Sequence, residues 1–401
     1  MGITAAPGPA GCTEAKKNRK FENAVATLYL PQKTELLQVK YGPYELPSAK
    51  AYLLFDIAHP VSYGPQMLNM FIHSSATTFL AMLKIFLVML TAGFLVRKRV
   101  LTPEHIKGLT IATVDVFLPC MIVHSIMKNL KPAEFDIWWV LPVGAGLMVL
   151  GGIGLAALSF FRELPEKRNM LPLTGVHNAA YLILPLGMLL YPDRFDLFSL
   201  YVFLFLTGQG PIIWSIGKYM TTAAPEDRFH WKDVLNPPLV WTIFALFLVF
   251  SGLRDMLMPD GRNPAGSITG SVFDVFFTTI KFLGDATVPL ALFILGGMLG
   301  SIRIRLNNIL WDLLRVLFIK FILLPALTFL ILVVTGLQRS HPLLATFFII
   351  QSAAPPAIVI MLQVNRYGGD EQKLGSMLLV AYLVCLLALP CWLALWDGLA
   401  V

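Results

Sequence analysis

The chain has 401 residues, of which 56% are hydrophobic and only 14% are charged. A soluble globular domain is nearer a quarter charged, so this composition excludes a soluble protein and predicts an all-α polytopic membrane protein in contact with membrane lipids. The net charge of +7 does not indicate a nucleic-acid partner, because Lys and Arg lie mostly at the ends of apolar runs rather than on one patch. The four cysteines form neither a CxxC pair nor a Cys/His ligand spacing, so we expect no metal and no cofactor.

The N-terminal residues 1–70 differ from the rest of the chain. They combine a basic run at Lys16–Lys20 with scattered prolines, and they contain no apolar run long enough for a signal peptide. We therefore expect a poorly ordered tail. Three interpretations stay open: a dispensable tail, which we favour, a regulatory arm, or a start assigned upstream of Met67 or Met70.

After this tail the sequence divides into apolar windows of the length that crosses a bilayer as a helix, and we predict about ten spanning helices in two units of five. The first unit, residues 71–221, places them near 71–96, 106–127, 137–161, 171–191 and 197–220. The second unit, residues 236–397, places them near 237–258, 272–300, 310–336, 342–367 and 374–396.

Basic residues in the links between spans predict the orientation. The links after the first, third, fifth, seventh and ninth spans carry more Lys and Arg than the alternate links do. Links rich in Lys and Arg face the cytoplasm. We therefore expect a multi-pass protein of the plasma (cytoplasmic or inner) membrane with both termini outside.

Two sequence motifs recur in the second unit. Asp115-Val-Phe-Leu-Pro119 in the second span recurs as Asp285-Ala-Thr-Val-Pro289 in the seventh, 170 residues later. His177-Asn178-Ala-Ala in the fourth span corresponds to Gln351-Ser352-Ala-Ala in the ninth, 174 residues later. Because each unit has an odd number of spans, the second unit enters the membrane from the opposite side. We therefore predict two inverted five-helix repeats.

Prolines interrupt the fourth and ninth spans. Pro185 lies in the fourth, and Pro355-Pro356 lies in the middle of the ninth. A proline lacks an N–H group and frees a carbonyl of the preceding turn, which lipid cannot satisfy, so such a break persists where it lines a cavity. Broken helices at matching positions of inverted repeats are typical of the substrate site of a secondary transporter.

At these residues the sequence resembles the auxin efflux carrier family, the membrane transport proteins that include plant PIN carriers and bacterial malonate-type permeases. Four segments carry the resemblance: Asn178-Ala-Ala-Tyr-Leu-Ile-Leu-Pro185-Leu, Leu235-Asn-Pro-Pro238, Thr287-Val-Pro-Leu-Ala-Leu-Phe-Ile-Leu-Gly-Gly297, and Ala353-Ala-Pro-Pro-Ala357 through Asn365-Arg-Tyr-Gly-Gly-Asp370. The resemblance implies two inverted five-helix repeats with broken, crossing helices 4 and 9, where the substrate is expected. It also implies an elevator-type motion of helices three to five and eight to ten against a scaffold of helices one, two, six and seven.

The crossing supplies the candidate substrate site. Half-helix N-termini would offer free N–H groups and a partial positive charge to a carboxylate, and nearby polar side chains would add hydrogen bonds. An alternative of equal weight is that these side chains satisfy backbone groups exposed by the breaks. The residues that we assign to the site are Asn178, Tyr181, Pro185, Gln351, Ser352, Pro355 and Pro356.

Asp115 and Asp285 are candidates for proton or ion coupling, because a carboxylate inside a span usually marks an ion path or an internal partner. The alternative is a scaffold role, in which they pair with Lys84, Lys281 or a hydroxyl. His177 is the third candidate, since it adjoins the substrate residues and titrates near neutral pH, although a lone histidine is more often structural.

Basic side chains also occur inside the second half of the chain. Arg315 and Lys320 lie in an otherwise apolar span. We expect both to extend their charged ends to the membrane interface, in preference to two alternatives: that they pair internally, or that they attract an anion into the cavity.

These patterns predict a secondary transporter, an auxin efflux carrier-like permease, for a small organic anion such as a mono- or dicarboxylate. The alternative function is a membrane-embedded solute sensor or receptor with the same fold. A protease is disfavoured because neither intramembrane Asp has a Gly-rich partner motif, and a channel is disfavoured because no filter-like loop is evident. The solute, its coupling ion, its direction and the choice between monomer and homodimer stay open.

Overall fold

The computed structural model describes residues 64–221, 235–257, 268–305 and 309–399. Most of the predicted tail, residues 1–63, lies outside the described residues. The first helix, α4, begins at Gly64, before the predicted boundary at residue 70. The described residues form helices and no named β-strand, which confirms the all-α fold class.

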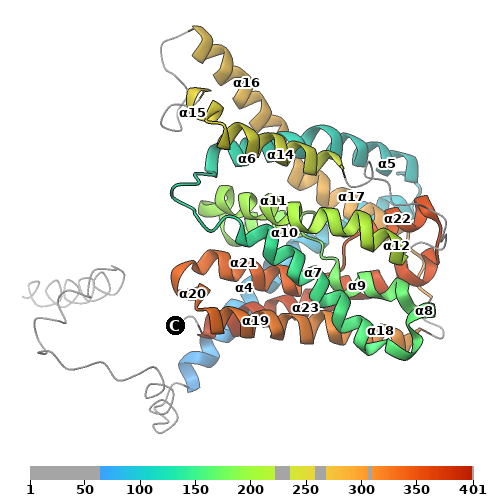
Figure 1. Cartoon of the computed structure of the whole chain (residues 1–401). Helices are drawn as coiled ribbons and strands as arrows, with labels where there is room; N and C mark the ends of the chain where they lie inside the picture. Colours follow the sequence, from blue (N-terminus) through green and yellow to red (C-terminus); the bar gives the residue numbers. More distant parts are fainter. Residues whose placement is uncertain (1–63, 222–234, 258–267, 306–308, 400–401) are drawn as a thin grey trace, which may run out of the picture. The chain divides into compact units, whose positions relative to one another are not determined.

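Helical elements occupy every predicted span, and several spans combine more than one element. In the described part of the chain, seven helices are long and apolar enough to cross a membrane, and the apolar helices Pro237–Phe250 and Pro342–Ala353 are shorter. The elements in chain order (Figure 1) are α4 (Gly64–Arg97), α5 (Pro103–Ala112), η1 (Thr113–Phe117), α6 (Leu118–Asn129), α7 (Val140–Ser159), η2 (Phe161–Glu163), α8 (Leu164–Lys167), η3 (Arg168–Met170), α9 (Leu171–Gly175), α10 (Ile183–Leu190), η4 (Pro192–Arg194), α11 (Phe195–Ile212), η5 (Ile213–Gly217), α12 (Lys218–Thr221), α14 (Pro237–Phe250), α15 (Leu253–Leu257), α16 (Ile268–Asp285), α17 (Thr287–Ser301), α18 (Leu310–Phe318), η7 (Ile319–Leu323), α19 (Leu324–Thr335), α20 (Leu337–Ser340), α21 (Pro342–Ala353), α22 (Val359–Tyr367) and α23 (Glu371–Leu399).

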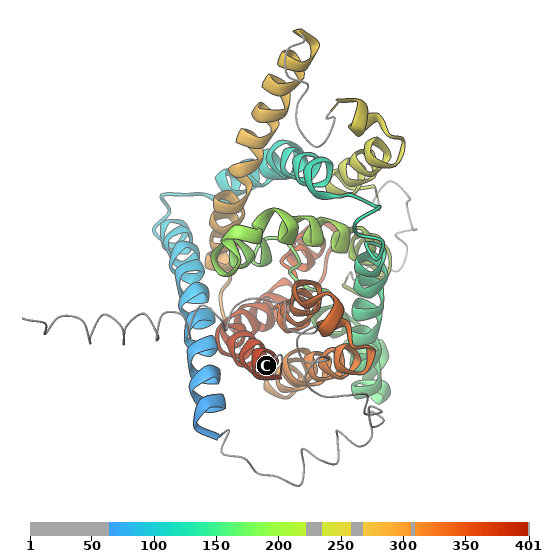
Figure 2. The same cartoon turned by 90° about the vertical axis from the view of Figure 1, so that its left-hand side faces the viewer.

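Helices of the two predicted units are interleaved. The first helix, α4, packs along α17 and α23 from the second unit, and α6 packs against α14, α16 and α11 (Figures 1 and 2). Helix α7 packs against α9 and α11. Buried apolar side chains from both units form one continuous core. The relation of the units as inverted repeats stays a prediction.

A π-helical turn, η7, interrupts the eighth predicted span just before Pro325. Proline cannot donate a backbone hydrogen bond, so the carbonyl of Phe321, four residues earlier, lacks its helical donor. That carbonyl accepts a hydrogen bond of 2.7 Å from Trp392 Nε1 on α23 instead. Lys320 lies in the same turn and is fully buried. The prediction that Lys320 reaches the membrane interface is therefore wrong.

Glycines permit the closest helix contacts. A Cβ atom at Gly208 in α11 would lie 1.9 Å from the carbonyl oxygen of Pro142 in α7. A Cβ atom at Gly152 in α7 would lie 2.6 Å from Cα of Gly175, at the end of α9. By contrast, no atom lies within 4 Å of a Cβ at Gly154, on the open face of α7. The small residues thus determine how closely α7 approaches the broken helix.

Gly208→Ala is expected to destabilise the protein by roughly 1–3 kcal/mol, because the added methyl group forces α11 away from α7. The measurement is the midpoint of thermal unfolding in detergent. Gly154→Ala is the matched control, and its midpoint should stay unchanged or rise, because alanine favours the helix more than glycine does. Equal midpoints for the two variants would contradict the close contact.

Candidate functional site

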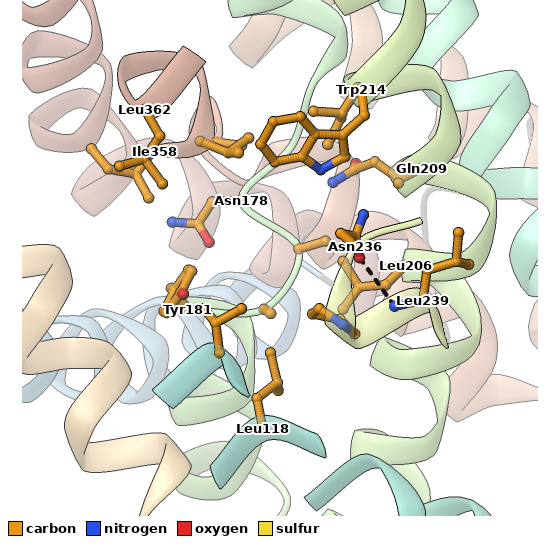
Figure 3. A pocket seen from close by; sticks show the side chains of 18 of the residues that line it. Leu118, Asn178, Tyr181, Leu206, Gln209, Trp214, Asn236, Leu239, Ile358 and Leu362 are labelled. Carbon is orange, nitrogen blue, oxygen red and sulfur yellow. Dashed lines mark hydrogen bonds between the residues drawn. The ribbon is translucent and has the colours of Figure 1, made fainter. Parts of the chain in front are cut away.

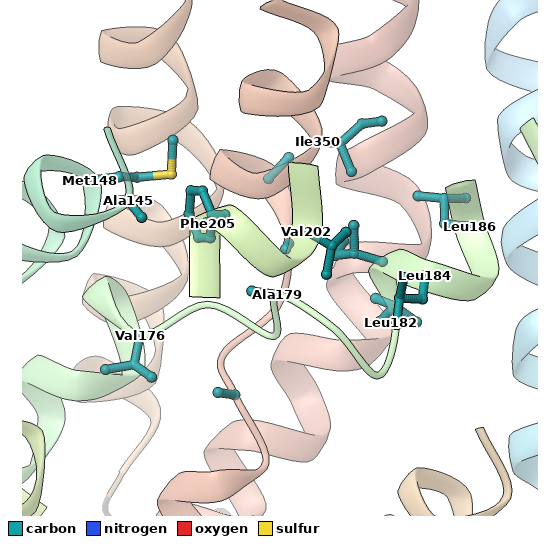
Figure 4. Packing of buried hydrophobic residues seen from close by; sticks show 14 of the residues in the cluster. Ala145, Met148, Val176, Ala179, Leu182, Leu184, Leu186, Val202, Phe205 and Ile350 are labelled. Carbon is teal, nitrogen blue, oxygen red and sulfur yellow. The ribbon is translucent and has the colours of Figure 1, made fainter. Parts of the chain in front are cut away.

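The fourth and ninth predicted spans are each broken in the middle. Helix α9 ends at Gly175 and α10 begins at Ile183, whereas α21 ends at Ala353 and α22 begins at Val359. The intervening segments, 176–182 and 354–358, are mostly buried among side chains of α11 and α21 (Figure 4). The predicted broken helices are therefore present, but the break in the fourth span precedes Pro185, which lies in the first turn of α10.

Two reciprocal backbone hydrogen bonds join the breaks where they cross. The N–H of Asn178 donates to the carbonyl of Pro355 at 2.9 Å, and the N–H of Ala357 donates to the carbonyl of Val176 at 3.0 Å. Pro355 and Pro356 lack N–H groups, so the paired stretch cannot extend through them. Each break satisfies backbone groups of the other, as the absence of water in a bilayer demands.

Gln209 of α11 stabilises the first break from the side. Its Oε1 accepts from the N–H of His177 at 3.3 Å, and its Nε2 donates to the carbonyl of His177 at 2.8 Å. The glutamine is 1% exposed. One buried amide therefore satisfies both backbone groups of a residue that has left the helix.

Asn178 and Gln351 also bind the exposed backbone. Oδ1 of Asn178 accepts from the N–H of Leu182 at 3.3 Å, and its amide donates to the hydroxyl of Tyr382 on α23. Nε2 of Gln351 donates to the carbonyl of Ala179 at 3.3 Å. These contacts agree with the alternative that both side chains satisfy backbone groups, and Asn178 also lines the cavity described next.

A cavity of about 340 Å³ lies beside the crossing (Figure 3). Asn178, Tyr181 and Ile358 lie on one side of it, and Gln209 and Asn236 lie on the other. It touches the residues that lead into both α10 and α22. Its walls are mainly apolar. The lining residues with polar side chains are Thr110, Asp115, His177, Asn178, Tyr181, Thr207, Gln209, Trp214, Asn236 and Thr242.

The cavity brings together only part of the predicted site. Asp115, His177, Asn178 and Tyr181 line it. Ser352 instead donates to the carbonyl of Ile349 in its own helix at 2.8 Å. The predicted residues that are not among those lining this cavity are Pro185, Gln351, Ser352, Pro355, Pro356 and Asp285.

Several polar lining residues were not assigned to the site from sequence, among them Gln209, Trp214 and Asn236. Asn236 caps α14, because its side chain accepts from the N–H of Leu239 at 3.0 Å. An Asn before two prolines is a recognisable helix start, so sequence indicated the cap but not the cavity. Nothing in the sequence placed Gln209 or Trp214 on this wall.

Asp115 and Asp285 occupy different environments. Asp115, in η1, lines the cavity. Asp285 forms an ion pair with Lys281 at 2.6 Å, and both side chains are about half exposed or more, at 62% and 48%. The structure thus gives Asp285 the partner that the scaffold alternative named, and the two aspartates do not form a catalytic dyad.

A second, wider cavity of about 730 Å³ adjoins the first, since both are lined by Thr110, Ile111, Trp214, Ile358 and Leu362. It extends to Lys107, near the start of α5, and to Glu371, at the start of α23. We call this second cavity the vestibule.

Polar contacts join the C-terminal end of α6 to the N-terminal end of α11. The hydroxyls of Ser125 in α6 and Ser199 in α11 lie 2.8 Å apart. Lys128 Nζ lies 2.6 Å from the carboxylate of Asp196, and Asn129 donates to the carbonyl of Asp196 at 3.2 Å. We call these five residues the α6–α11 seal. These contacts join a helix of the implied scaffold to a helix of the implied moving part.

Comparison with known proteins assigns the family. The family model described as membrane transport protein matches residues 77–230 and 222–393. This chain belongs to that family. The assignment confirms the resemblance to auxin efflux carriers, and it identifies the protein as a multi-pass integral membrane protein that acts as a transporter.

Two relatives agree with the assignment. An uncharacterized transporter of Methanocaldococcus jannaschii is 22% identical over 309 residues, which cover 73% of this membrane transport protein and 90% of the relative. The protein PIN-LIKES 5 of Arabidopsis thaliana is 25% identical over 175 residues, which cover 42% of each chain.

Gln209→Leu should destabilise the protein, because it leaves the buried N–H and carbonyl of His177 without partners. Each unpaired buried group costs roughly 1–3 kcal/mol. The measurement is again the thermal midpoint in detergent, with Gln372→Leu as the control at a half-buried glutamine in the first turn of α23. An equal loss in both variants would show that Gln209 has no special role at the break.

Proposed function

We propose that this membrane transport protein is a secondary transporter for a small organic anion that carries a carboxylate. The observation that supports this proposal best is that one cavity reaches the starts of two half-helices, at Tyr181 before α10 and at Ile358 before α22. The N-terminal end of a helix carries a partial positive charge, which favours a carboxylate. The anion would bind there without a buried arginine.

The lining of the cavity suits an anion with an apolar body. Most of its wall is apolar, and Asn178, Tyr181 and Asn236 supply a small number of hydrogen-bonding groups. Ligand pockets with this balance hold an apolar body and orient it through few polar contacts. A carboxylate attached to a hydrocarbon or aromatic group matches this arrangement better than a fully polar solute does.

The position of the cavity supports an elevator-type motion. The helices implied to form the scaffold contribute Thr110, Leu239 and Thr242, and the helices implied to move contribute Asn178 and Ile358. A substrate between two parts of the protein is carried if one part slides against the other. We propose that α7 to α12 and α18 to α23 move together against α4 to α6 and α14 to α17.

We also propose that the described conformation is open to the cytoplasm. The vestibule reaches Lys107, which belongs to the basic links that the charge bias places inside. The α6–α11 seal would then face the outside of the plasma membrane, together with both termini.

Uptake into proteoliposomes tests the proposed transport. Wild type should accumulate labelled indole-acetate or malonate saturably, and Asn178→Ala should lower the rate at least about tenfold, since it removes a polar group from the cavity and from the first break. Asn69→Ala is the control at an exposed asparagine of α4, outside the cavity. Carrier transport also predicts counterflow. Binding without uptake or counterflow would favour a sensor of the same fold and contradict the transporter.

A reversible disulfide tests the elevator motion. Ser125→Cys with Ser199→Cys joins α6 to α11, so oxidation should stop uptake and reduction should restore it. The controls are the two single-cysteine variants, Ser125→Cys and Ser199→Cys, which should keep uptake under the same oxidation. Uptake that continues with the pair fully oxidised would contradict relative motion of α6 and α11.

A further inference from the structure

Lys320 and His177 form a buried contact between two basic side chains behind the cavity. Nζ of Lys320 lies 2.5 Å from Nδ1 of His177, and both residues are 0% exposed. Nε2 of His177 makes no hydrogen bond within the described residues. Two basic nitrogens approach this closely when one proton lies between them, because two protonated groups repel and two lone pairs also repel. One shared proton therefore fits this contact better than two protons do.

No carboxylate in the described residues neutralises this pair. The elements packed against η7 are α7, α9, α18, α19, α21 and α23. Four of them, α7, α9, α19 and α21, contain no titratable residue. In α18, Asp312 and Arg315 form ion pairs with other residues.

Helix α23 and the cavity contribute the other titratable groups near the pair. On α23, the thiol of Cys385 donates to a backbone carbonyl, and Tyr382 binds Asn178. Asp115 lines the same cavity as His177, from the scaffold side. A charge on Lys320 therefore has no fixed counter-ion within the part proposed to move.

We propose that Lys320 and His177 form a one-proton site in which the imidazole ring conducts the proton to the lysine. In the neutral pair, Nδ1–H of His177 donates to the lone pair of the Lys320 amine. A proton that arrives from the cavity binds Nε2, and Nδ1 then passes its own proton to Nζ. The ammonium now donates to Nδ1, the ring is neutral with its proton on Nε2, and the pair has gained one proton.

The proton site sets the charge that accompanies the substrate, a step that rests on the proposed function. The protonated pair carries one positive charge, which a bound monocarboxylate neutralises. An uncompensated charge is expensive inside a membrane, so the moving part crosses with a proton and an anion together or with neither. Transport is then an electroneutral symport of one proton with each monocarboxylate.

Nitrogen NMR of the purified full chain, with isotopically labelled histidine, tests the proton site without transport. The His177 signal is identified by its loss in His177→Gln. Acidification through roughly pH 9 to 5 should exchange the protonated ring nitrogen from Nδ1 to Nε2 in wild type, a range that brackets ordinary imidazole titration. Lys320→Met, of similar length and apolar, should abolish this exchange, and Lys84→Met at an exposed lysine should retain it.

Proteoliposome uptake tests the stoichiometry. Uptake is counted as the initial rate above that of protein-free liposomes, because neutral indole-acetic acid crosses a bilayer unaided. With indole-acetate, one proton per anion predicts that this protein-dependent accumulation rises with the pH difference and is unchanged by an imposed membrane potential. Lys320→Met should lose this accumulation and keep counterflow. Lys320→Gln provides a second variant, and unchanged thermal midpoints establish that both variants fold.

The outcomes separate the two proposals. If wild type moves no carboxylate while the ring exchange occurs, the proposed function fails and the proton site stands. If wild type transports but the exchange is absent, or persists in Lys320→Met, the proton site is overturned and the carrier stands. Accumulation that survives in Lys320→Met overturns the symport.

Discussion

Backbone groups that leave a helix inside a membrane protein need partners in the protein, and the crossing of the two breaks meets this need with few contacts. The bonds from Asn178 to Pro355 and from Ala357 to Val176 fix the two segments against each other. This register determines where α10 and α22 begin, and therefore where the positive ends of their helix dipoles lie. Gln209 and Gln351 satisfy neighbouring backbone groups. The position of the cavity follows from this set of hydrogen bonds.

The position of the buried lysine depends on a proline in the same span. Pro325 removes one helical hydrogen bond, the turn widens into η7, and Trp392 satisfies the carbonyl that is left. Lys320 lies in that widened turn and reaches His177 at the crossing. The backbone irregularity thus places a basic group beside the broken helix, at a depth where a regular apolar helix would present only hydrocarbon. The proposed proton site therefore depends on this irregular turn.

Sequence patterns predicted the spans, the two breaks and several residues around the cavity, because apolar length and proline position act locally. They did not distinguish the environments of Asp115 and Asp285, because the position of a residue along a span does not show which face of the helix its side chain occupies. Polar residues in the ninth span were assigned to the substrate, but Gln351 and Ser352 bond to backbone carbonyls. The burial of Lys320 depends on a π-helical turn, which the hydrophobic pattern does not encode.

The vestibule would make inhibition depend on the side of the membrane to which an inhibitor is added. A carboxylate short enough to fit the cavity of about 340 Å³ would be enclosed when the two parts slide. One with a longer tail would project past Trp214 and Leu362 into the vestibule, which is also lined by both parts, and would hold them apart. Chain length alone would then convert a substrate into a blocker. Such a blocker would act only from the side on which the vestibule opens, so that the same molecule added to the other face would leave transport unaffected.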